Sequence, residues 1–498
     1  MRYRLGVGAS AATAGEARIE PGDWPRFLED TDGPQLVVGG PGTGKTEFLV
    51  RRAVTLIDGG RCPPEHLLVL TFSRRGAADL AERIHGTLGR TVRGIDASTF
   101  HSLAMRLLET HAGRREWETA PTILTGPEQQ RLVASLLAAE DAGSWSPAHR
   151  SMLGTRTFAG EVTDFLLRCR ERLIDPGMLA EMVESNPEWR GLPGFLTRYE
   201  AELRRRRQID YGTLLREAVA LLQMPDIATA AGEQYRYVLV DEYQDTTAAQ
   251  ARMLRALVAG HGNITAAADP YQSIYSFRGA DLANVERFPD DFASADGPPA
   301  PRIVLIRSHR VPAEILAAAV RVTQHDLPGS AGEVIPATGA GSVETYRFQQ
   351  QTEEAEWIAS EITRLHLEQR IPYHRIGVLV RSKRRLTPDL SRALQRRRVP
   401  HDRPDARLVD EPAVRYVHDL VLAATGDDGH AETARAIRRL LLGPFHRLPL
   451  GRVRDLERNR AKTGAPWAEL ILLHVPEASA LASLIDDPGW AVDRPAAK

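Results

Sequence analysis

Gly39-Gly-Pro-Gly-Thr-Gly-Lys-Thr46 is the stretch of sequence that decides the fold. It matches the phosphate-loop pattern GxxxxGK[ST], in which glycines let the backbone wrap around an anion and a lysine reaches the terminal phosphates. The apolar run Gln35–Val38 before it predicts a buried strand, and Glu47–Ile57 after it has helical spacing. We therefore expect a nucleoside triphosphate to bind Gly39, Gly40, Pro41, Gly42, Thr43, Gly44, Lys45 and Thr46.

Lysine is so rare in this chain that its place in the loop is informative. Of 64 basic residues, only those at positions 45, 383, 462 and 498 are lysines. The planar fork of an arginine fits a phosphate loop poorly, whereas a compact ammonium fits it well. A glycine-rich turn that matched the pattern by accident would rarely carry such an uncommon residue at the required position.

Composition excludes several classes of protein. The chain has 498 residues, 43% of them hydrophobic and 26% charged, which is ordinary for a globular protein with several cores. At roughly 150 residues per domain, this length predicts about three structural units. The formal net charge of −1 excludes a histone-like polycation and an acidic disordered tail. A local basic groove stays compatible with it, because a net charge averages over all faces.

Cysteines and apolar runs indicate the compartment. Cys62 and Cys169 stand far apart and form no CxxC pair, which excludes a zinc ribbon, an iron–sulfur cluster and a disulfide framework. No apolar run approaches the ~18 residues that a membrane span needs. We therefore expect a cytoplasmic protein that has no membrane partner.

Strand and helix patterns alternate along the chain and predict a doubly wound α/β fold. Further strands are expected at 67–71, 237–240, 264–268, 303–305 and 376–380, and a helix at 76–85. Between about 110 and 232 the pattern is almost wholly helical, which predicts an inserted subdomain. A proline-rich patch at Gly297–Pro301 marks the expected boundary between two α/β units, and the pattern is helical again from about Asp410.

Two carboxylates follow the expected strand Tyr237–Val240. Asp241 at the end of a strand has the chemistry to hold Mg²⁺ with the hydroxyl of Thr46, and Glu242 to deprotonate an attacking water. Most such acidic pairs are solvated turns. The phosphate loop upstream favours the catalytic interpretation here.

A second polar segment follows the expected strand at 264–268. Gln272 is uncharged and has the chemistry to sense a terminal phosphate, while Tyr275, Phe277 and Arg278 offer flat surfaces and a cation for unpaired bases. For any one of the aromatic residues, ordinary core packing is the alternative.

The order of these motifs resembles the UvrD/Rep-type helicases of superfamily 1, including helicase–nuclease subunits built on the same motor. The segments that carry the resemblance are Thr71–Leu80, Ser98–Leu103, Ile209–Leu215, Val240–Thr246, Gln272–Ala280 and Leu305–Arg310. The resemblance implies two RecA-like domains with parallel sheets, each interrupted by a helical insert. It places the first domain at 1–109 and 233–300 and its insert at 110–232, with a partial second domain at 301–409 and the start of a second insert at 410–498.

The resemblance also implies an activity and residue roles. It implies an ATP-dependent 3′→5′ helicase or translocase on single-stranded and partly duplex DNA, used in repair or recombination, with ATP and Mg²⁺. Lys45, Asp241 and Glu242 keep the roles argued above, Gln272 couples the γ-phosphate to domain movement, and Arg310 reaches the γ-phosphate from the second domain. The residues implied to line the single-strand track are Phe72, Thr99, His101, Tyr275, Phe277 and Arg278.

Departures from the family's pattern fall into two groups. The segment Ile19–Trp24 lacks the usual adenine-reading glutamine, Glu47 replaces an arginine, and His309 replaces a tyrosine. These changes predict weaker discrimination between ATP and other triphosphates, such as GTP. The family's last motifs do not occur before Lys498, so we expect an incomplete second motor domain. The alternative is therefore a nucleotide-switched DNA-binding subunit, and a helicase–nuclease partner subunit is among the expected partners.

Overall fold

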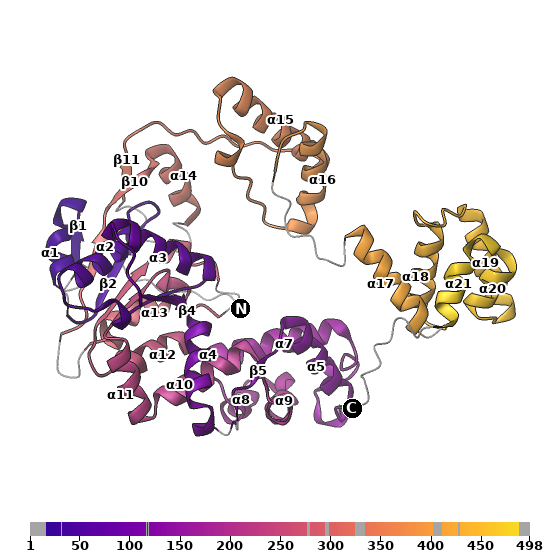
Figure 1. Ribbon diagram of the computed structural model, residues 1–498, viewed down its shortest axis with the longest axis horizontal. Coiled ribbons are helices and arrows are strands. Elements are labelled where there is room, and N and C mark those ends of the chain that lie inside the picture. The colour runs from indigo at the N-terminus through magenta and orange to yellow at the C-terminus, as the bar shows by residue number, and fades with distance from the viewer. Residues whose placement is uncertain are drawn as a thin grey trace. The chain divides into compact units, whose positions relative to one another are not determined.

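The computed structural model describes residues 16–30, 32–115, 117, 119–275, 279–293, 298–323, 334–401, 411–426 and 429–487. The chain divides after Glu344 into two compact units (Figure 1). Within the described residues, no helix has the length and apolar character that crossing a bilayer requires.

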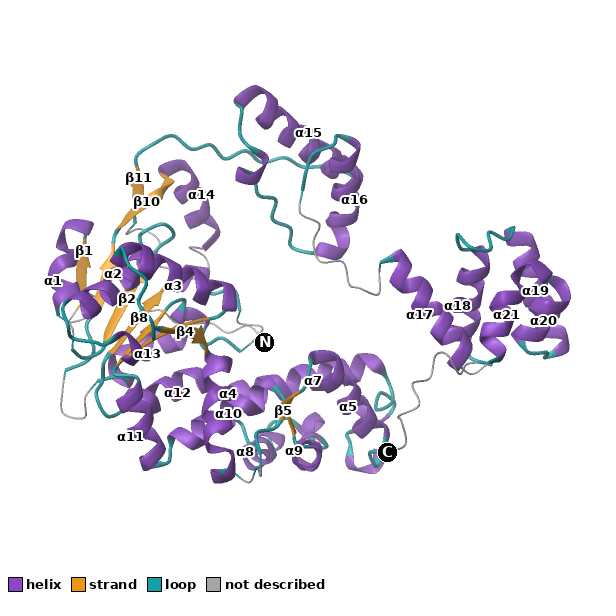
Figure 2. Ribbon diagram, in the orientation of Figure 1, coloured by secondary structure: helices purple, strands orange, loops and turns teal. Residues whose placement is uncertain are grey.

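A seven-stranded parallel sheet organises the first unit, and its strands are drawn in orange in Figure 2. Its order is β1-β9-β2-β8-β7-β3-β4. The strands are β1 (Glu16–Ile19), β2 (Gln35–Gly39), β3 (Leu67–Thr71), β4 (Asp96–Thr99), β7 (Tyr237–Val240), β8 (Ile264–Ala268) and β9 (Arg302–Leu305). The strands predicted at the phosphate loop, 67–71, 237–240, 264–268 and 303–305 are confirmed.

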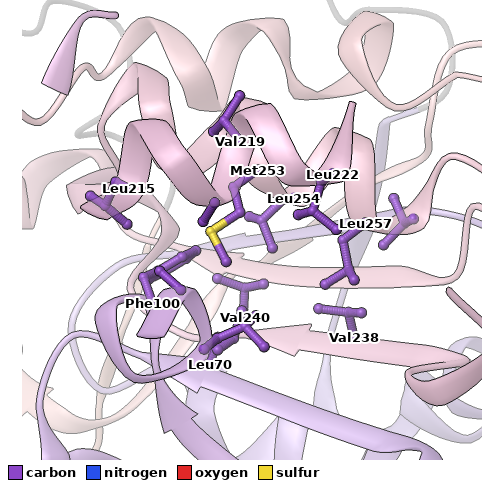
Figure 3. Close-up of a cluster of buried hydrophobic side chains, with 14 of the residues drawn as sticks. Leu70, Phe100, Leu215, Val219, Leu222, Val238, Val240, Met253, Leu254 and Leu257 are labelled. Carbon is purple, nitrogen blue, oxygen red and sulfur yellow. The ribbon is translucent and has the colours of Figure 1, made fainter. Parts of the chain in front are cut away.

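Helices cover both faces of this sheet because its central strands are apolar on both sides. Leu67, Val69 and Leu239 face a core with α2 (Lys45–Asp58) and α3 (Arg74–Leu88). Leu70 and Val240 point the other way, towards the side chains of Met253 and Leu254 (Figure 3). The helices of that face are α4 (Phe100–His111), α10 (Tyr211–Leu222), α11 (Pro225–Gln234), α12 (Ala248–Val258) and α13 (Ala283–Asp291).

Residues 110–232 are mostly helical, and a part of them forms a hydrophobic core of its own. That core runs from Leu124 to Leu203. Its elements are α5 (Gly126–Ala138), α6 (Pro147–Arg150), α7 (Arg156–Glu171), α8 (Pro176–Val183) and α9 (Leu192–Arg206), flanked by the paired strands β5 (Thr122–Ile123) and β6 (Gln208–Ile209). Leu214 and Ile227 pack against the large sheet instead, so α10 and α11 belong to the sheet layer.

Strand β9 lies in the first sheet, although the sequence placed 301–409 in the second domain. It pairs with β1 and with β2, for example through Val37 and Ile303. The chain then continues into β10 (Arg307–Pro312), α14 (Ala313–Thr323) and β11 (Ile335–Ala337), where β10 and β11 form a two-stranded parallel sheet. The proline-rich patch therefore precedes the last strand of the first sheet.

The second unit is helical in its described residues, and the strand predicted at 376–380 is wrong. Helices α15 (Gln351–Gln369) and α16 (Lys383–Arg396) pack together around Ala359 and Ala393. Residues 376–380 between them form no strand, and Leu379 is 100% exposed. A strand forms only beside a neighbour that accepts its backbone hydrogen bonds, and no described segment does so here.

The C-terminal part of this unit confirms the helical pattern expected from Asp410 onward. Its helices are α17 (Pro412–Thr425), α18 (Ala431–Leu442), α19 (Leu450–Thr463), α20 (Trp467–His474) and α21 (Ser479–Asp486). They share one hydrophobic core that contains Ile437, Trp467 and Leu481.

Candidate nucleotide site

The phosphate loop connects β2 to α2 and depends on glycine at two positions. Gly42 and Gly44 have φ angles of +75° and +94°, a backbone conformation that residues with a Cβ atom rarely adopt. A Cβ atom on Gly44 would also lie 3.0 Å from the ring of Trp24. Trp24 is buried and its ring packs beside Gly44, so the helix α1 (Trp24–Glu29) contacts the phosphate loop.

Lys45 and Gln272 share one buried carboxylate. The ammonium of Lys45 lies 3.0 Å from Oδ2 of Asp269 and donates to the carbonyl of Gly40 at 3.0 Å. Nε2 of Gln272 donates to the same oxygen of Asp269 at 2.6 Å. Asp269 is fully buried. Two donors that the sequence assigned to a terminal phosphate therefore already converge on one anionic oxygen.

Asp269 itself was missed by the sequence analysis. It follows the strand β8, which lies between β2 and β7 in the sheet. The carboxyl ends of neighbouring parallel strands meet at one edge, so an acidic residue at the end of β8 was the available signal.

Thr46 and Asp241 form an oxygen pair beside the loop. Oγ1 of Thr46 donates to Oδ2 of Asp241 at 3.0 Å. Burial and, second, the charge of the neighbouring Glu242 together raise the pKa of Asp241 to about 6. A buried carboxylate with a raised pKa is a place where a cation restores the charged form.

The donor set fits Mg²⁺ bound together with a nucleotide. No group of three or more histidine, cysteine or acidic side chains arranged for a metal occurs in the described part of the chain. Mg²⁺ at nucleotide sites takes only one or two protein ligands, because water and phosphate oxygens complete its octahedron. A hydroxyl and a carboxylate oxygen from Thr46 and Asp241 match that requirement.

Glu242 has an unusual backbone conformation. Its φ angle is +55°, which costs a residue with a Cβ atom about 1–2 kcal/mol. The turn is held by the Glu242 N–H, which donates to Oδ1 of Asp241 at 3.0 Å, and by Nε2 of Gln244, which donates to Oε2 of Glu242 at 2.6 Å. These hydrogen bonds fix the orientation of the Glu242 carboxylate although the backbone conformation is unfavourable.

A cavity of about 450 Å³ brings the predicted residues together. Its lining includes Thr46, Phe72, Asp241, Glu242, Gln272 and Tyr275. The rings of Phe72 and Tyr275 are nearly parallel, with centroids 6.4 Å apart. Asp245 also lines the cavity, and its burial raises the pKa of its carboxyl to about 6, with Glu242 adding to the effect. Residues predicted for hydrolysis and residues predicted for DNA therefore share one space.

The remaining residues of the predicted DNA track are placed differently. Thr99 caps α4, where its hydroxyl accepts the N–H of Ser102 at 3.2 Å. His101 packs edge-on against Tyr211 with ring centroids 5.3 Å apart, and burial lowers the pKa of His101 to about 4, so its imidazole is neutral at pH 7. Neither residue lines the cavity. Phe277 and Arg278 lie outside the described residues.

Strand β10 crosses the phosphate loop and brings Arg310 beside it. The His309 N–H donates to the carbonyl of Gly42 at 2.8 Å, and the Ser308 hydroxyl donates to that of Pro41 at 2.9 Å. A Cβ atom on Gly42 would lie 3.0 Å from Cβ of Arg310. Arg310 itself is exposed to solvent. Ser308 was not singled out from the sequence, because its role depends on this crossing.

Glu47, at the position where the resembled family has an arginine, is held by two cations. It accepts hydrogen bonds from Nε of Arg51 at 2.9 Å and from Nη2 of Arg83 at 2.8 Å. Burial opposes its ionised form, but the two guanidinium groups outweigh burial and lower the pKa of Glu47.

Two family models match this chain in sequence order. The model described as the UvrD/REP helicase N-terminal domain matches residues 25–293, and that of the UvrD-like helicase C-terminal domain matches residues 303–408. Together they represent two RecA-like domains, as the sequence analysis predicted.

Curated relatives carry helicase names. The chain is 30% identical to the ATP-dependent DNA helicase UvrD1 of Mycobacterium tuberculosis (strain ATCC 25618 / H37Rv) over 363 residues, 70% of this chain and 45% of that protein. It is 30% identical to the ATP-dependent DNA helicase PcrA of Leuconostoc citreum, over 71% of this chain and 46% of that protein. DNA helicase II of Rickettsia typhi (strain ATCC VR-144 / Wilmington) is 29% identical, over 71% of this chain and 52% of that protein.

These matches bear on the predicted partners. The chain spans about half the length of the curated relatives it matches. The names of two of these relatives describe ATP-dependent DNA helicases. None of these names mentions a nuclease, so the predicted helicase–nuclease partner finds no support here.

Proposed function

Because this chain belongs to the UvrD/REP helicase family, we propose that it is an ATP-dependent DNA helicase that moves along single-stranded DNA. The observation that carries the proposal is the cavity that Glu242 and Asp241 share with Phe72 and Tyr275. A site of this kind joins the hydrolysis of a phosphate bond to contact with unpaired bases.

Hydrolysis follows from the positions of the polar groups. The loop N–H groups and the N-terminus of α2 cradle the phosphates of the substrate ATP. Lys45 and Gln272 both donate to one carboxylate oxygen of Asp269. When ATP binds, they exchange this oxygen for an oxygen of the γ-phosphate. Thr46 and Asp241 would hold Mg²⁺, which would supply positive charge to offset that of the phosphates. Glu242 orients and deprotonates the attacking water, and Arg310 places a guanidinium on the γ-phosphate.

The DNA track begins at the same cavity. Phe72 and Tyr275 present ring faces on which bases stack. We assign Thr99, His101, Phe277 and Arg278 to the same track from the resemblance to the family. We assign the direction as 3′→5′ and the process as DNA repair or recombination, both from the resemblance to the family. The free, buried Cys62 and Cys169 are consistent with a reducing cytoplasm.

Strand displacement tests this proposal. Duplexes with a single-stranded 3′ tail or 5′ tail are offered with MgATP, and the release of the labelled strand is followed. We expect release from the 3′-tailed duplex only, and none with Lys45→Ala. Release from the 5′-tailed duplex alone would contradict the direction, and release by Lys45→Ala would contradict the assigned site.

Nucleotide choice provides a separate prediction. The cations around Glu47 occupy its carboxylate, so it is not available as a specific acceptor for a base. Together with the missing glutamine before the loop, this predicts that GTP is hydrolysed at a rate within about tenfold of ATP, since one lost base contact is worth about 1–1.5 kcal/mol. A preference for ATP of a thousandfold would contradict it.

A further inference from the structure

Gln244 bridges two loops at the carboxyl edge of the sheet. Its side chain is 1% exposed. Nε2 donates to Oε2 of Glu242 at 2.6 Å, and Oε1 accepts the backbone N–H of Asp269 at 2.9 Å. The backbone carbonyl of Gln244 also accepts from the hydroxyl of Ser273 at 3.5 Å. One amide thus connects the loop after β7 to the loop after β8.

The amide of Gln244 satisfies both neighbours at once, which a charged or apolar side chain does not. A carboxylate offers acceptors only, and an ammonium offers donors only, whereas an amide has one oxygen and two N–H groups. The oxygen of Gln244 serves a backbone N–H and its nitrogen serves a carboxylate. An apolar side chain of the same length would leave the Asp269 N–H without its acceptor, and a carboxylate would face that of Glu242.

The far end of this bridge is the residue that holds Lys45 and Gln272. The carboxylate of Asp269 accepts from Lys45 at 3.0 Å and from Gln272 at 2.6 Å, while its backbone N–H binds Gln244. The two phosphate-binding donors are therefore connected to the carboxylate of Glu242 through the side chain and backbone of Asp269 and the amide of Gln244. The φ angle of Glu242 is +55°, which is unfavourable for a residue with a Cβ atom, so surrounding contacts must hold the residue in this conformation.

We propose that Gln244 is a positioning residue that orients the carboxylate of Glu242 towards the attacking water. It makes this orientation depend on whether Asp269 is hydrogen-bonded to Lys45 and Gln272. The inference rests on the function proposed above and adds a regulation of the same site. When a terminal phosphate takes Lys45 and Gln272 from Asp269, the loop after β8 is released on one side, and Gln244 transmits the change to Glu242. Hydrolysis then depends on the phosphate being in place.

Steady-state kinetics of Gln244→Met and Gln244→Glu test the proposal. Both changes remove the donor to Glu242, and Gln244→Glu keeps an acceptor oxygen for the Asp269 N–H. We expect kcat for single-strand-stimulated ATP hydrolysis to fall about 10–100-fold, because a displaced catalytic group costs that much. KM for ATP should stay within about twofold, since Gln244 touches no group assigned to binding.

Gln250→Met is the matched control. Gln250 is 4% exposed, and its Oε1 accepts the Thr247 N–H at 3.0 Å at the start of α12, away from Glu242. The same chemical change there should lower thermal stability and leave kcat within about twofold. If Gln244→Met fails to fold, Gln244→Glu carries the test alone. A kcat for Gln244→Glu equal to that of Gln250→Met would overturn the proposal.

A double-mutant cycle tests the link to Asp269. Gln272→Ala is combined with Gln244→Met, and kcat is compared with the single variants. If the residues act through one set of hydrogen bonds, Gln272→Ala should cost less than about twofold once Gln244 is changed. Multiplicative losses would contradict the link. Wild-type protein without any ATP hydrolysis would refute the proposed function instead, so the two failures are distinguishable.

Discussion

Replacing Asp269 with asparagine tests whether a protein carboxylate holds the phosphate-binding donors before the nucleotide arrives. The change keeps the size of the side chain and one acceptor oxygen, and it removes the negative charge. Lys45 then loses its ion-pair partner at 3.0 Å, and the Gln272 amide loses a charged acceptor at 2.6 Å. We expect the nucleotide-free protein to lose stability.

The magnitude follows from burial. The side chain of Lys45 is 10% exposed and that of Asp269 is fully buried. Removing one partner of a buried ion pair costs about 3–5 kcal/mol. Lys45 keeps the carbonyl of Gly40 at 3.0 Å, so the expected loss is at the lower end, about 3 kcal/mol in the unfolding free energy of the first unit.

Denaturant unfolding with and without a non-hydrolysable ATP analogue provides the assay. The analogue supplies the anion that Lys45 and Gln272 have lost, so it should stabilise Asp269→Asn more than wild type. Asp58→Asn is the control, because Asp58 is exposed and its ion pair with Arg90 lies at the surface, so neutralising it should change stability by less than about 1 kcal/mol. Equal stabilisation of Asp269→Asn and wild type by the analogue would refute the reasoning.

Three further predictions concern the same site. The pKa of Asp241 is about 6 in the fold against an ordinary value of 3.8, so the protonated carboxyl stabilises the nucleotide-free fold below pH 4, and about 3 kcal/mol of this stability is lost as the pH rises through 6. Asp241→Asn should flatten this part of a curve of unfolding free energy against pH. An unchanged curve would contradict the assigned burial. Gly44→Ala should cost more than Gly60→Ala, because both positions have positive φ but only Gly44 meets the Trp24 ring; equal melting temperatures would contradict the packing. Tyr275→Ala should weaken single-strand binding by about 1–3 kcal/mol if a base stacks there, and unchanged binding in a fluorescence titration would return Tyr275 to a packing role.

Local patterns were sufficient for the elements that carry the phosphate loop. The strands Tyr237–Val240 and Ile264–Ala268 are buried on both faces, so they appear in the sequence as short apolar runs. Strand β1 escaped prediction, because Glu16–Ile19 carries two charged residues and is stabilised by pairing with β9. The strand predicted at 376–380 failed for the opposite reason, since an apolar run without a neighbour stays unpaired.

The candidate site was predictable only where one residue type indicates its chemistry. Lys45 and Asp241 follow strands in recognisable motifs. Asp269 and Gln244 act through lateral neighbours, and the order β2-β8-β7 that makes them neighbours is a property of the sheet rather than of any local pattern. The same holds for Ser308, whose contact with Pro41 depends on β10 crossing the loop.

Whether this cavity couples ATP to a DNA strand can be measured as the rate of ATP hydrolysis with and without single-stranded DNA. Our account predicts that DNA stimulates the wild-type protein several-fold or more and that Lys45→Ala and Glu242→Gln abolish turnover in both conditions. Hydrolysis that persists in Lys45→Ala, or a wild-type rate that DNA leaves unchanged, would contradict the claim that this cavity couples ATP to a DNA strand.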